Sequence, residues 1–293
     1  MALYALGDLH LSFGTDKPMD QFGKVWVHHE EKIRKNWENT VREEDTIVLA
    51  GDISWGKNER ELEPDFDFLM SLPGRKILLR GNHDMFWNVK KTKRLNDKYQ
   101  GRLFFLQNNF SSYREYALVG TKGYCFENLD SFGHFQLIQE RELERLRVSF
   151  EAAKEAGYQK FLVFLHYPPT SAIWPPTEEL CRLIGVSRRE ERRIRAAEEA
   201  CLRRHGGVDM GGNPVFDLSR LPADRQRQLG AVTEFLRSPF TDLAEEYGAS
   251  SVIYAHCHGK ARFHDSLSGL VRGIRYQLVS GDFMDFQPYL VMN

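Results

Sequence analysis

The sequence has few cysteines, no long apolar run and no signal for export. Its four cysteines are far apart and form no CxxC pair, which argues against a disulfide framework or a zinc ribbon and predicts a cytoplasmic protein. The apolar runs, such as residues 161–165, have the length of one strand, far below the ~20 residues that span a bilayer. The first residues reach Asp8 without a basic region, so we expect neither a signal peptide nor a membrane partner.

An excess of charge of one sign is also lacking. The chain has 40 lysines and arginines against 41 aspartates and glutamates, and its formal net charge is −1. This balance gives no overall attraction to nucleic acid, which is therefore not favoured as a partner. The glycine-rich patterns GxGxxG and GxxxxGK[ST] are absent as well. Hydrophobic residues make up 42% of the chain, which is ample for a large core and excludes a wholly disordered protein.

Short apolar runs that end in polar residues are the main signal that the sequence does contain. They cover residues 2–7, 46–50, 75–80, 160–165 and 251–255, and they lead into Asp8, Asp52, Asn82, His166 and His256. A nearly continuous apolar run is typical of a strand that is buried on both faces. Because ligands of open α/β sheets bind beyond the carboxyl ends of the strands, these polar residues predict a site.

Stretches with helical spacing separate these strands, so the sequence predicts an α/β fold. Apolar residues recur at helical intervals over 21–43 and 139–156, among charged residues. Further strands are expected at 103–106, 115–121 and 275–280.

Residues 170–239 interrupt the strand series, and we expect a largely helical insertion there that could cap the site. All basic residues of this segment are arginines. The guanidinium fork suits phosphate, so Arg188 and Arg192 are candidate substrate contacts. Glutamates lie among these arginines, and a solvated helix face with surface ion pairs is the alternative.

The polar residues after the strands form an ordered set of metal-binding types. The seven candidate ligands are Asp8, His10, Asp52, Asn82, His166, His256 and His258. Imidazole and carboxylate ligands suit Mn, Fe, Zn or Co. Seven are too many for one tetrahedral zinc and about right for two ions that share a carboxylate. Two residues at i and i+2 can face one ion if the backbone bends after the strand.

The order of these blocks resembles the calcineurin-like metallophosphoesterase superfamily, whose pattern is DxH, GD, GNH(D/E), H and GHxH. One position departs from the pattern, because Ala255 stands where the family usually has glycine. Alanine is a mild change there if its φ is negative. The flanks DLHLS, GDISW, GNHD and LHYPP are similar to a bacterial group of predicted phosphohydrolases. The GDxxDRG block of phosphoprotein phosphatases is absent, which argues against a protein phosphatase.

The ligand blocks extend from Asp8 to His258, so both ends of the chain build one site and we expect a single domain over residues 1–293. The resemblance implies a four-layer α/β/β/α sandwich of two mixed sheets flanked by helices. It implies two divalent transition metal ions, Mn most of all, with Fe, Zn or Co as alternatives. By this resemblance one ion is held by Asp8, His10, Asp52 and His258, and the other by Asp52, Asn82, His166 and His256.

The resemblance also implies a reaction. A hydroxide that bridges the ions attacks phosphorus in line, in a phosphodiester or phosphomonoester of a small or nucleotide-like substrate. His83 would protonate the leaving oxygen or stabilise the transition state, and Asp84 would set the tautomer of a nearby imidazole.

Several alternatives stay open at the level of sequence. The same site could serve a nuclease, or the chain could be a non-catalytic metal-binding scaffold. Trp55 and Trp87 follow two ligand blocks, where they could wall the pocket, stack on a base or aryl group, or pack in the core. The oligomeric state is open as well.

Overall fold

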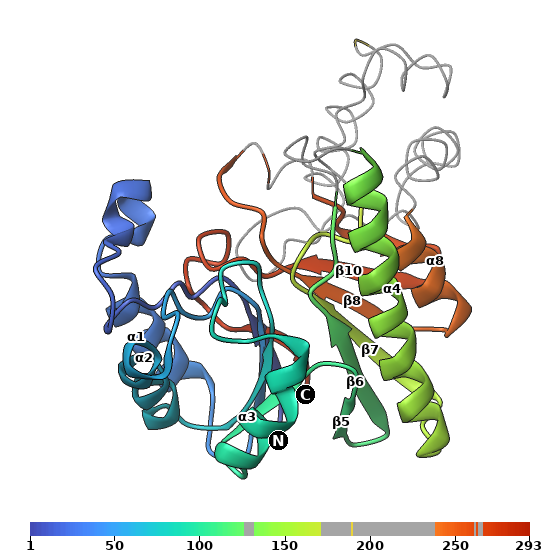
Figure 1. Ribbon diagram of the computed structural model, residues 1–293, viewed down its shortest axis with the longest axis horizontal. Coiled ribbons are helices and arrows are strands. Elements are labelled where there is room, and N and C mark those ends of the chain that lie inside the picture. Colours follow the sequence, from blue (N-terminus) through green and yellow to red (C-terminus); the bar gives the residue numbers. More distant parts are fainter. Residues whose placement is uncertain (126–131, 171–188, 190–237, 261, 263–265) are drawn as a thin grey trace.

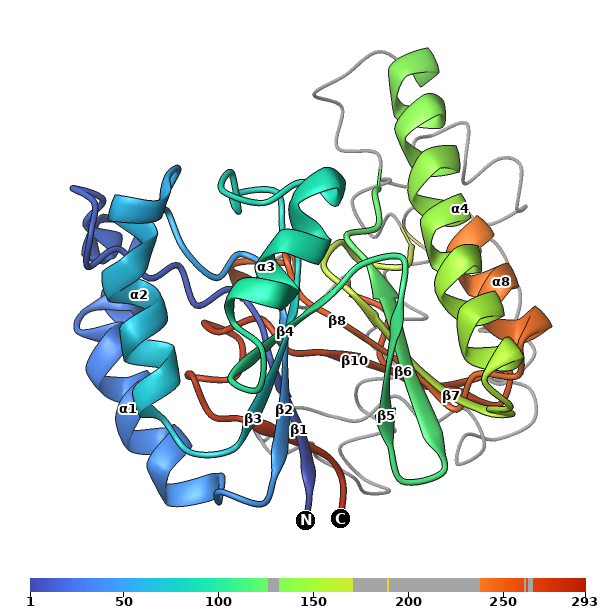
Figure 2. The ribbon, with the colours of Figure 1, turned by 60° about the horizontal axis from the view of Figure 1, so that its bottom comes forward.

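The computed structural model describes residues 1–125, 132–170, 189, 238–260, 262 and 266–293. Two mixed sheets face each other, and helices cover the outer side of each sheet (Figures 1 and 2). The expected insertion at 170–239 lies almost wholly outside the described residues.

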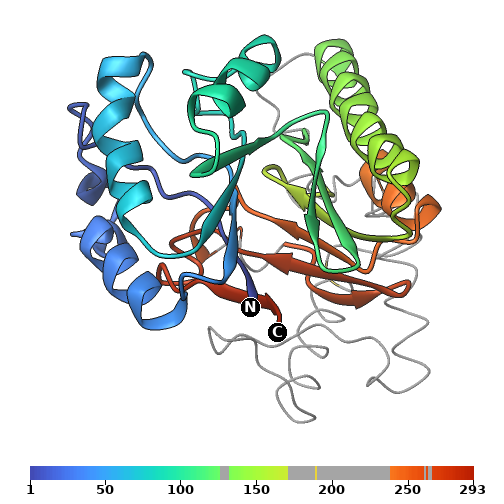
Figure 3. The ribbon, with the colours of Figure 1, turned by 90° about the horizontal axis from the view of Figure 1, so that it is seen from below.

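The first sheet has five strands in the order β11-β1-β2-β3-β4. They are β1 (Leu3–Leu6), β2 (Thr46–Ala50), β3 (Arg75–Leu79), β4 (Leu103–Leu106) and β11 (Tyr289–Met292). Strands β1 to β4 are parallel to one another, while β11 runs antiparallel to β1. The two termini therefore lie side by side (Figure 3). Its outer helices are α1 (His29–Thr40), α2 (Glu59–Ser71) and α3 (Thr92–Lys98).

The second sheet has six strands in the order β5-β6-β7-β8-β10-β9. They are β5 (Phe110–Tyr113), β6 (Tyr116–Thr121), β7 (Lys160–Leu165), β8 (Ser251–Tyr254), β9 (Gly269–Val271) and β10 (Ile274–Leu278). The four central strands are parallel and both edge strands are antiparallel. Helices α4 (Phe132–Glu155) and α8 (Pro239–Glu246) cover the outer face.

The side chains of β7 show how the layers are held together. Leu162 and Phe164 belong to an apolar cluster that extends through the first sheet to its helices. Phe161 and Val163 belong to a second cluster that contains Phe150 of α4. Because successive side chains of a strand point to opposite faces, β7 packs on the first sheet with one face and on helices with the other. This arrangement confirms the predicted α/β/β/α sandwich.

The structure corrects the predicted elements at several points. The helix expected over 21–43 is interrupted, because Gly23 and His28 have positive φ, and only α1 is a regular helix. Helices α2 and α3 and the edge strands β5, β9 and β11 were not predicted. Among the described residues, no helix has the length and apolar character needed to cross a membrane.

The two sheets touch where β1 and β8 end. The backbone N–H of Gly7 donates to the carbonyl of Val279, 2.8 Å away, which links the end of β1 to the segment after β10. A Cβ atom on Gly7 would lie only 2.4 Å from the Cβ of Ala255. Ala255 does not have positive φ, so alanine fits its own backbone, and Gly7 leaves the space that its methyl group needs.

We therefore expect Gly7→Ala to lower the free energy of unfolding by about 1–3 kcal/mol, the usual cost of overpacking. Ala255→Gly in the same chain should recover most of that loss, because it removes the opposing methyl group. Urea unfolding of the two single variants and the double variant measures the coupling. Additive losses would show that the two positions do not compete for space.

Candidate metal centre

Four of the predicted ligands stand on backbone that bends sharply after a strand. Asp8, His10, Asp52 and His256 all have positive φ, between 46° and 71°. Residues other than glycine rarely adopt this conformation, which costs about 1–3 kcal/mol at each position. The bend lets the i and i+2 side chains of Asp8 and His10 converge, as the DxH spacing requires.

The first group of ligand atoms comes from Asp8, His10 and His258, and these atoms lie within 4.8 Å of one another. Nε2 of His258 is 3.7 Å from Oδ1 of Asp8, which is too long for a hydrogen bond and suits two ligands of one ion. Among the described residues, Oδ1 of Asp8 and Nδ1 of His10 are buried without a hydrogen-bond partner. A cation fits the orphaned oxygen of Asp8.

The second group comes from Asp52, His166 and His256. The carbonyl of Ala50 accepts a hydrogen bond of 2.9 Å from Nδ1 of His166, so Nε2 carries the lone pair. This nitrogen lies 3.5 Å from Oδ2 of Asp52 and 3.2 Å from Nδ1 of His256. Oδ1 of Asn82 is 2.7 Å away. Lone pairs of Asp52, Asn82 and His166 thus converge at one point, as they would around an ion.

Asp52 lies between the two groups. Its Oδ1 accepts a hydrogen bond of 2.8 Å from the backbone N–H of His83. Its Oδ2 is 3.7 Å from Nε2 of His10 and 3.5 Å from Nε2 of His166, so it faces one ligand of each group. A Cβ atom on Gly81 would come within 2.1 Å of Oδ1, which explains the glycine of the GNHD block.

Burial dominates the electrostatics of the centre. It raises the pKa of Asp8, and it raises the pKa of Asp52 well above the usual range, with the nearby acids Asp84 and Asp8 adding to the effect. Burial also lowers the pKa of His10 and His166 well below the usual range. Neutral imidazoles and buried carboxylates are the ligand forms that a divalent ion prefers, since its charge compensates the acids.

His83 lies at the mouth of the centre, with 39% of its side chain exposed and Nε2 3.9 Å from Oδ2 of Asp52. The half-buried ring of Trp55 is 4.4 Å from the His83 ring and stacks on His10 at 5.2 Å. The Lys17 ammonium lies 4.7 Å from the Trp55 ring centroid. Burial lowers the pKa of His83 to about 4, so its imidazole is neutral at pH 7.

The other aromatic candidate, Trp87, lies in the core and not at the centre. It is 1% exposed, donates its indole N–H to Oγ1 of Thr92 at 3.0 Å, and packs edge-on against Phe105. The prediction of a substrate contact is therefore wrong for Trp87. Arg188 and Arg192 lie outside the described residues.

Asp84 holds a loop, and within the described part of the chain it has no imidazole partner. Its buried carboxylate accepts backbone hydrogen bonds from Gly81, Asp52, Ile53 and Ser54, at 2.7, 3.0, 2.9 and 3.2 Å. Burial raises the pKa of Asp84 to about 6, although these amides favour the ionised form. The predicted role in setting a tautomer is thus wrong, because the carboxylate is taken up by the loop that carries Asp52.

Asp282 is a residue of the centre that was not predicted. Its Oδ1 accepts a hydrogen bond of 2.9 Å from Nδ1 of His258, and its Oδ2 accepts one of 3.1 Å from the N–H of Gly259. Nε2 of His258 therefore carries the lone pair that faces Asp8. The sequence has a signal for Asp282, since the predicted strand 275–280 runs into a Gly-Asp pair as an earlier strand does.

With this geometry in place, the comparison with known families is decisive. The family model of the calcineurin-like phosphoesterases matches residues 1–260, and the chain belongs to this family. The matched range contains every predicted ligand. Members of the family are metal-dependent phosphoesterases.

Individual relatives match shorter stretches. The "Gene 66 protein" of Mycobacterium phage D29 is 30% identical over 96 residues, which are 28% of this chain and 47% of that protein. The "Gene 66 protein" of Mycobacterium phage L5 is 36% identical over 77 residues, 26% of this chain and 37% of that protein. The uncharacterized protein MJ1445 of Methanocaldococcus jannaschii is 35% identical over 112 residues, 36% of this chain and 58% of that protein.

Two solved structures align over most of the chain. The protein of unknown function AQ665 from Aquifex aeolicus covers 98% of this chain and 94% of its own, with 15% identity and a TM-score of 0.43. The protein TT1561 of Thermus thermophilus covers 88% of this chain and 82% of its own, with 12% identity and a TM-score of 0.44.

We expect Asp84→Asn to lower the free energy of unfolding by about 2–4 kcal/mol, because one carbonyl oxygen cannot satisfy four buried amides. Urea unfolding gives the value. The matched control is Asp97→Asn, an exposed aspartate of α3, which should change stability by less than about 0.5 kcal/mol. Equal effects of the two substitutions would contradict the role of Asp84 in the loop.

Proposed function

We propose that this chain is a dinuclear-metal phosphohydrolase that cleaves a phosphodiester or phosphomonoester bond of a small or nucleotide-like substrate. One observation carries the proposal: two groups of ligand atoms adjoin each other, and Oδ2 of Asp52 faces both. A site for a single structural ion would not need a second group.

The first ion would be held by Asp8, His10, Asp52 and His258, and the second by Asp52, Asn82, His166 and His256. Imidazole and carboxylate donors suit Mn²⁺, which we propose as the preferred ion, and also Fe, Zn or Co. When bound, the ions would supply charge for the phosphoryl oxygens and acidify water for an in-line attack.

The chain itself contributes the groups around the reacting phosphoryl. His83 is partly exposed next to Asp52, which supports a role for its ring N–H in binding the phosphoryl or the leaving oxygen. Trp55 supports this position, because its ring contacts both His83 and the candidate ligand His10. We assign Trp55 to the wall of the site on this basis.

We also propose that residues 1–293 form one domain, with 170–239 as an insertion, and that the enzyme acts in the cytoplasm. The candidate centre supports the first point, since Asp8 and Asp52 follow strands of the first sheet and His166 and His256 follow strands of the second. Neither sheet can build the centre alone.

We expect Asp52→Asn to reduce the Mn²⁺ content from two equivalents per chain and to lower turnover by about 100-fold or more. Substitution of a residue that only hydrogen-bonds to a metal ligand already lowers metal affinity or activity by about 10- to 100-fold, and Asp52 is a candidate ligand itself. Elemental analysis and a Mn²⁺-supplemented screen measure both. The screen compares an aryl phosphomonoester, an aryl phosphodiester, cyclic nucleotides and single-stranded nucleic acid. Asp67→Asn, at an exposed position of α2, is the control.

The proposal would fail if the Mn²⁺-supplemented wild type held no metal or hydrolysed none of these compounds, which would favour a non-catalytic scaffold. Turnover confined to nucleic acid, with binding that weakens steeply as salt rises, would favour a nuclease.

We further expect Asp282→Asn to weaken Mn²⁺ binding by about 10-fold, because an amide is a poorer acceptor for Nδ1 of His258. Calorimetric titration of metal-free protein with Mn²⁺ gives the affinity. Asp285→Asn, at an exposed position of the same loop, should leave the affinity unchanged. Equal affinities of the Asp282→Asn variant and the wild type would exclude a role for Asp282 in holding His258.

A further inference from the structure

Two cationic residues, Arg80 and Lys122, have backbones that adjoin those of candidate ligands. Arg80 follows β3 and precedes the Gly81-Asn82 pair. Lys122 follows β6, and its carbonyl accepts hydrogen bonds from the backbone N–H groups of His166, at 3.1 Å, and Tyr167, at 2.9 Å. Both cations therefore lie at the Asn82–His166 side of the centre, whereas Lys17 and Trp55 lie beside His83.

The Lys122 ammonium is half-buried between aromatic rings. It lies 4.9 Å from the ring centroid of Tyr124 and 5.0 Å from that of Tyr167. Among the described residues no carboxylate lies within ion-pair distance of it. Glu142, an acid nearby, accepts a hydrogen bond of 2.5 Å from Oγ1 of Thr121 and pairs with Arg145. Cation–π contacts offset only part of the cost of burying an ammonium.

Arg80 is also incompletely satisfied. The side chain is half-buried, and its Nε has no hydrogen-bond partner within the described part of the chain. The two residues flank the Asn82–His166 pair, whose side chains are 2.7 Å apart, because Arg80 precedes Gly81-Asn82 and the carbonyl of Lys122 binds the backbone N–H of His166. Burial and the charges of Arg80 and Arg145 lower the pKa of Lys122, whereas Glu142 and Asp52 raise it. Like charges in a partly buried place are unfavourable unless an anion lies between them.

We propose that Arg80 and Lys122 form an anion-binding subsite that takes a second phosphate of the substrate, beyond the phosphoryl group that is cleaved. A guanidinium fork next to an ammonium suits phosphate. The Tyr167 ring contacts both the Lys122 ammonium and the His256 ring, the latter at 4.0 Å, so it spaces the ammonium from the candidate ligands. The substrate class rests on the proposed function, while the subsite itself does not.

The subsite can be tested by direct binding, without turnover. Metal-free protein is titrated with inorganic pyrophosphate in a calorimeter at low salt. Lys122→Met keeps the apolar stem but removes the charge, and it should weaken binding about 10-fold or more, the value of one charge-assisted contact. Lys122→Arg should restore most of the affinity, and Arg80→Met should weaken it like Lys122→Met.

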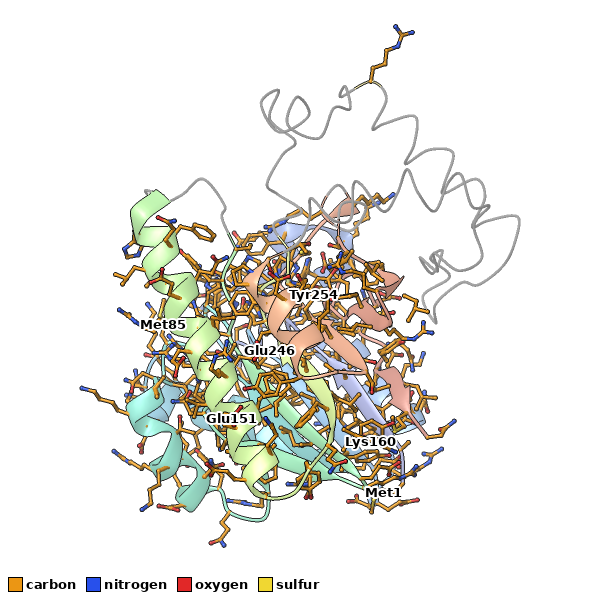
Figure 4. The ribbon with its side chains drawn as sticks, turned by 90° about the vertical axis from the view of Figure 1, so that its right-hand side faces the viewer. Met1, Met85, Glu151, Lys160, Glu246 and Tyr254 are labelled. Carbon is orange, nitrogen blue, oxygen red and sulfur yellow. The ribbon has the colours of Figure 1, made fainter. Side chains whose placement is uncertain are left out.

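The matched control is Lys160→Met. Lys160 also lies near a tyrosine ring, 5.6 Å from that of Tyr116. It begins β7, however, at the end of the sheet opposite to Tyr254, which ends β8 two residues before the candidate ligand His256 (Figure 4). Its loss should not change pyrophosphate binding. Equal affinity of the wild type and the Lys122→Met variant, or no binding by the wild type, would overturn the subsite.

A second measurement tests the substrate class. With Mn²⁺ present, Lys122→Met should raise the KM for adenosine 3′,5′-bisphosphate about 10-fold more than the KM for adenosine 3′-phosphate, because only the former offers a second phosphate. Equal increases would place Lys122 at the cleaved group and overturn the assignment. If the wild type hydrolyses no phosphoester while pyrophosphate binding depends on Lys122, the proposed function fails and the subsite stands.

Discussion

The burial of three carboxylates at the ends of neighbouring strands is the constraint on which the rest of the centre depends. Asp84 is satisfied by four backbone amides of the loop that it holds. Asp52 and Asp8 each accept one amide hydrogen bond, from His83 and His256, and turn their other oxygen toward imidazoles. Burial lowers the pKa of His10 and His166 and keeps their imidazoles neutral, so these rings do not compensate the charge of the carboxylates, whereas divalent cations would.

The topology brings these groups together. Parallel strands end at the same edge of a sheet, and the two sheets meet at Gly7 and Ala255, so residues from both ends of the matched range reach one place. Positive φ at Asp8, His10 and Asp52 then aims the side chains inward. Strain of this kind persists only where the surroundings impose it, and here the packed sheets do so.

Much of this could be predicted from the sequence, because buried parallel strands are continuous apolar runs and the ligands follow them directly. Edge strands such as β9, of three residues, are too short and too mixed to stand out. The partners of a side chain are a different matter. The contacts of Asp84 with the loop after β2, and of Trp87 with Phe105, depend on tertiary packing that no local pattern encodes. Asp282 could have been predicted from the sequence, because a Gly-Asp pair directly after a strand is a local signal.

The central claim is that two ions complete the buried acid cluster and share Asp52. Anomalous diffraction from crystals grown with Mn²⁺ tests it most directly, because it locates each ion without regard to activity. We predict two peaks about 3.5–4 Å apart, one beside Asp8 and His258 and the other beside His166 and His256, with Asp52 between them. A single peak, or two peaks of which only one contacts Asp52, would contradict the claim.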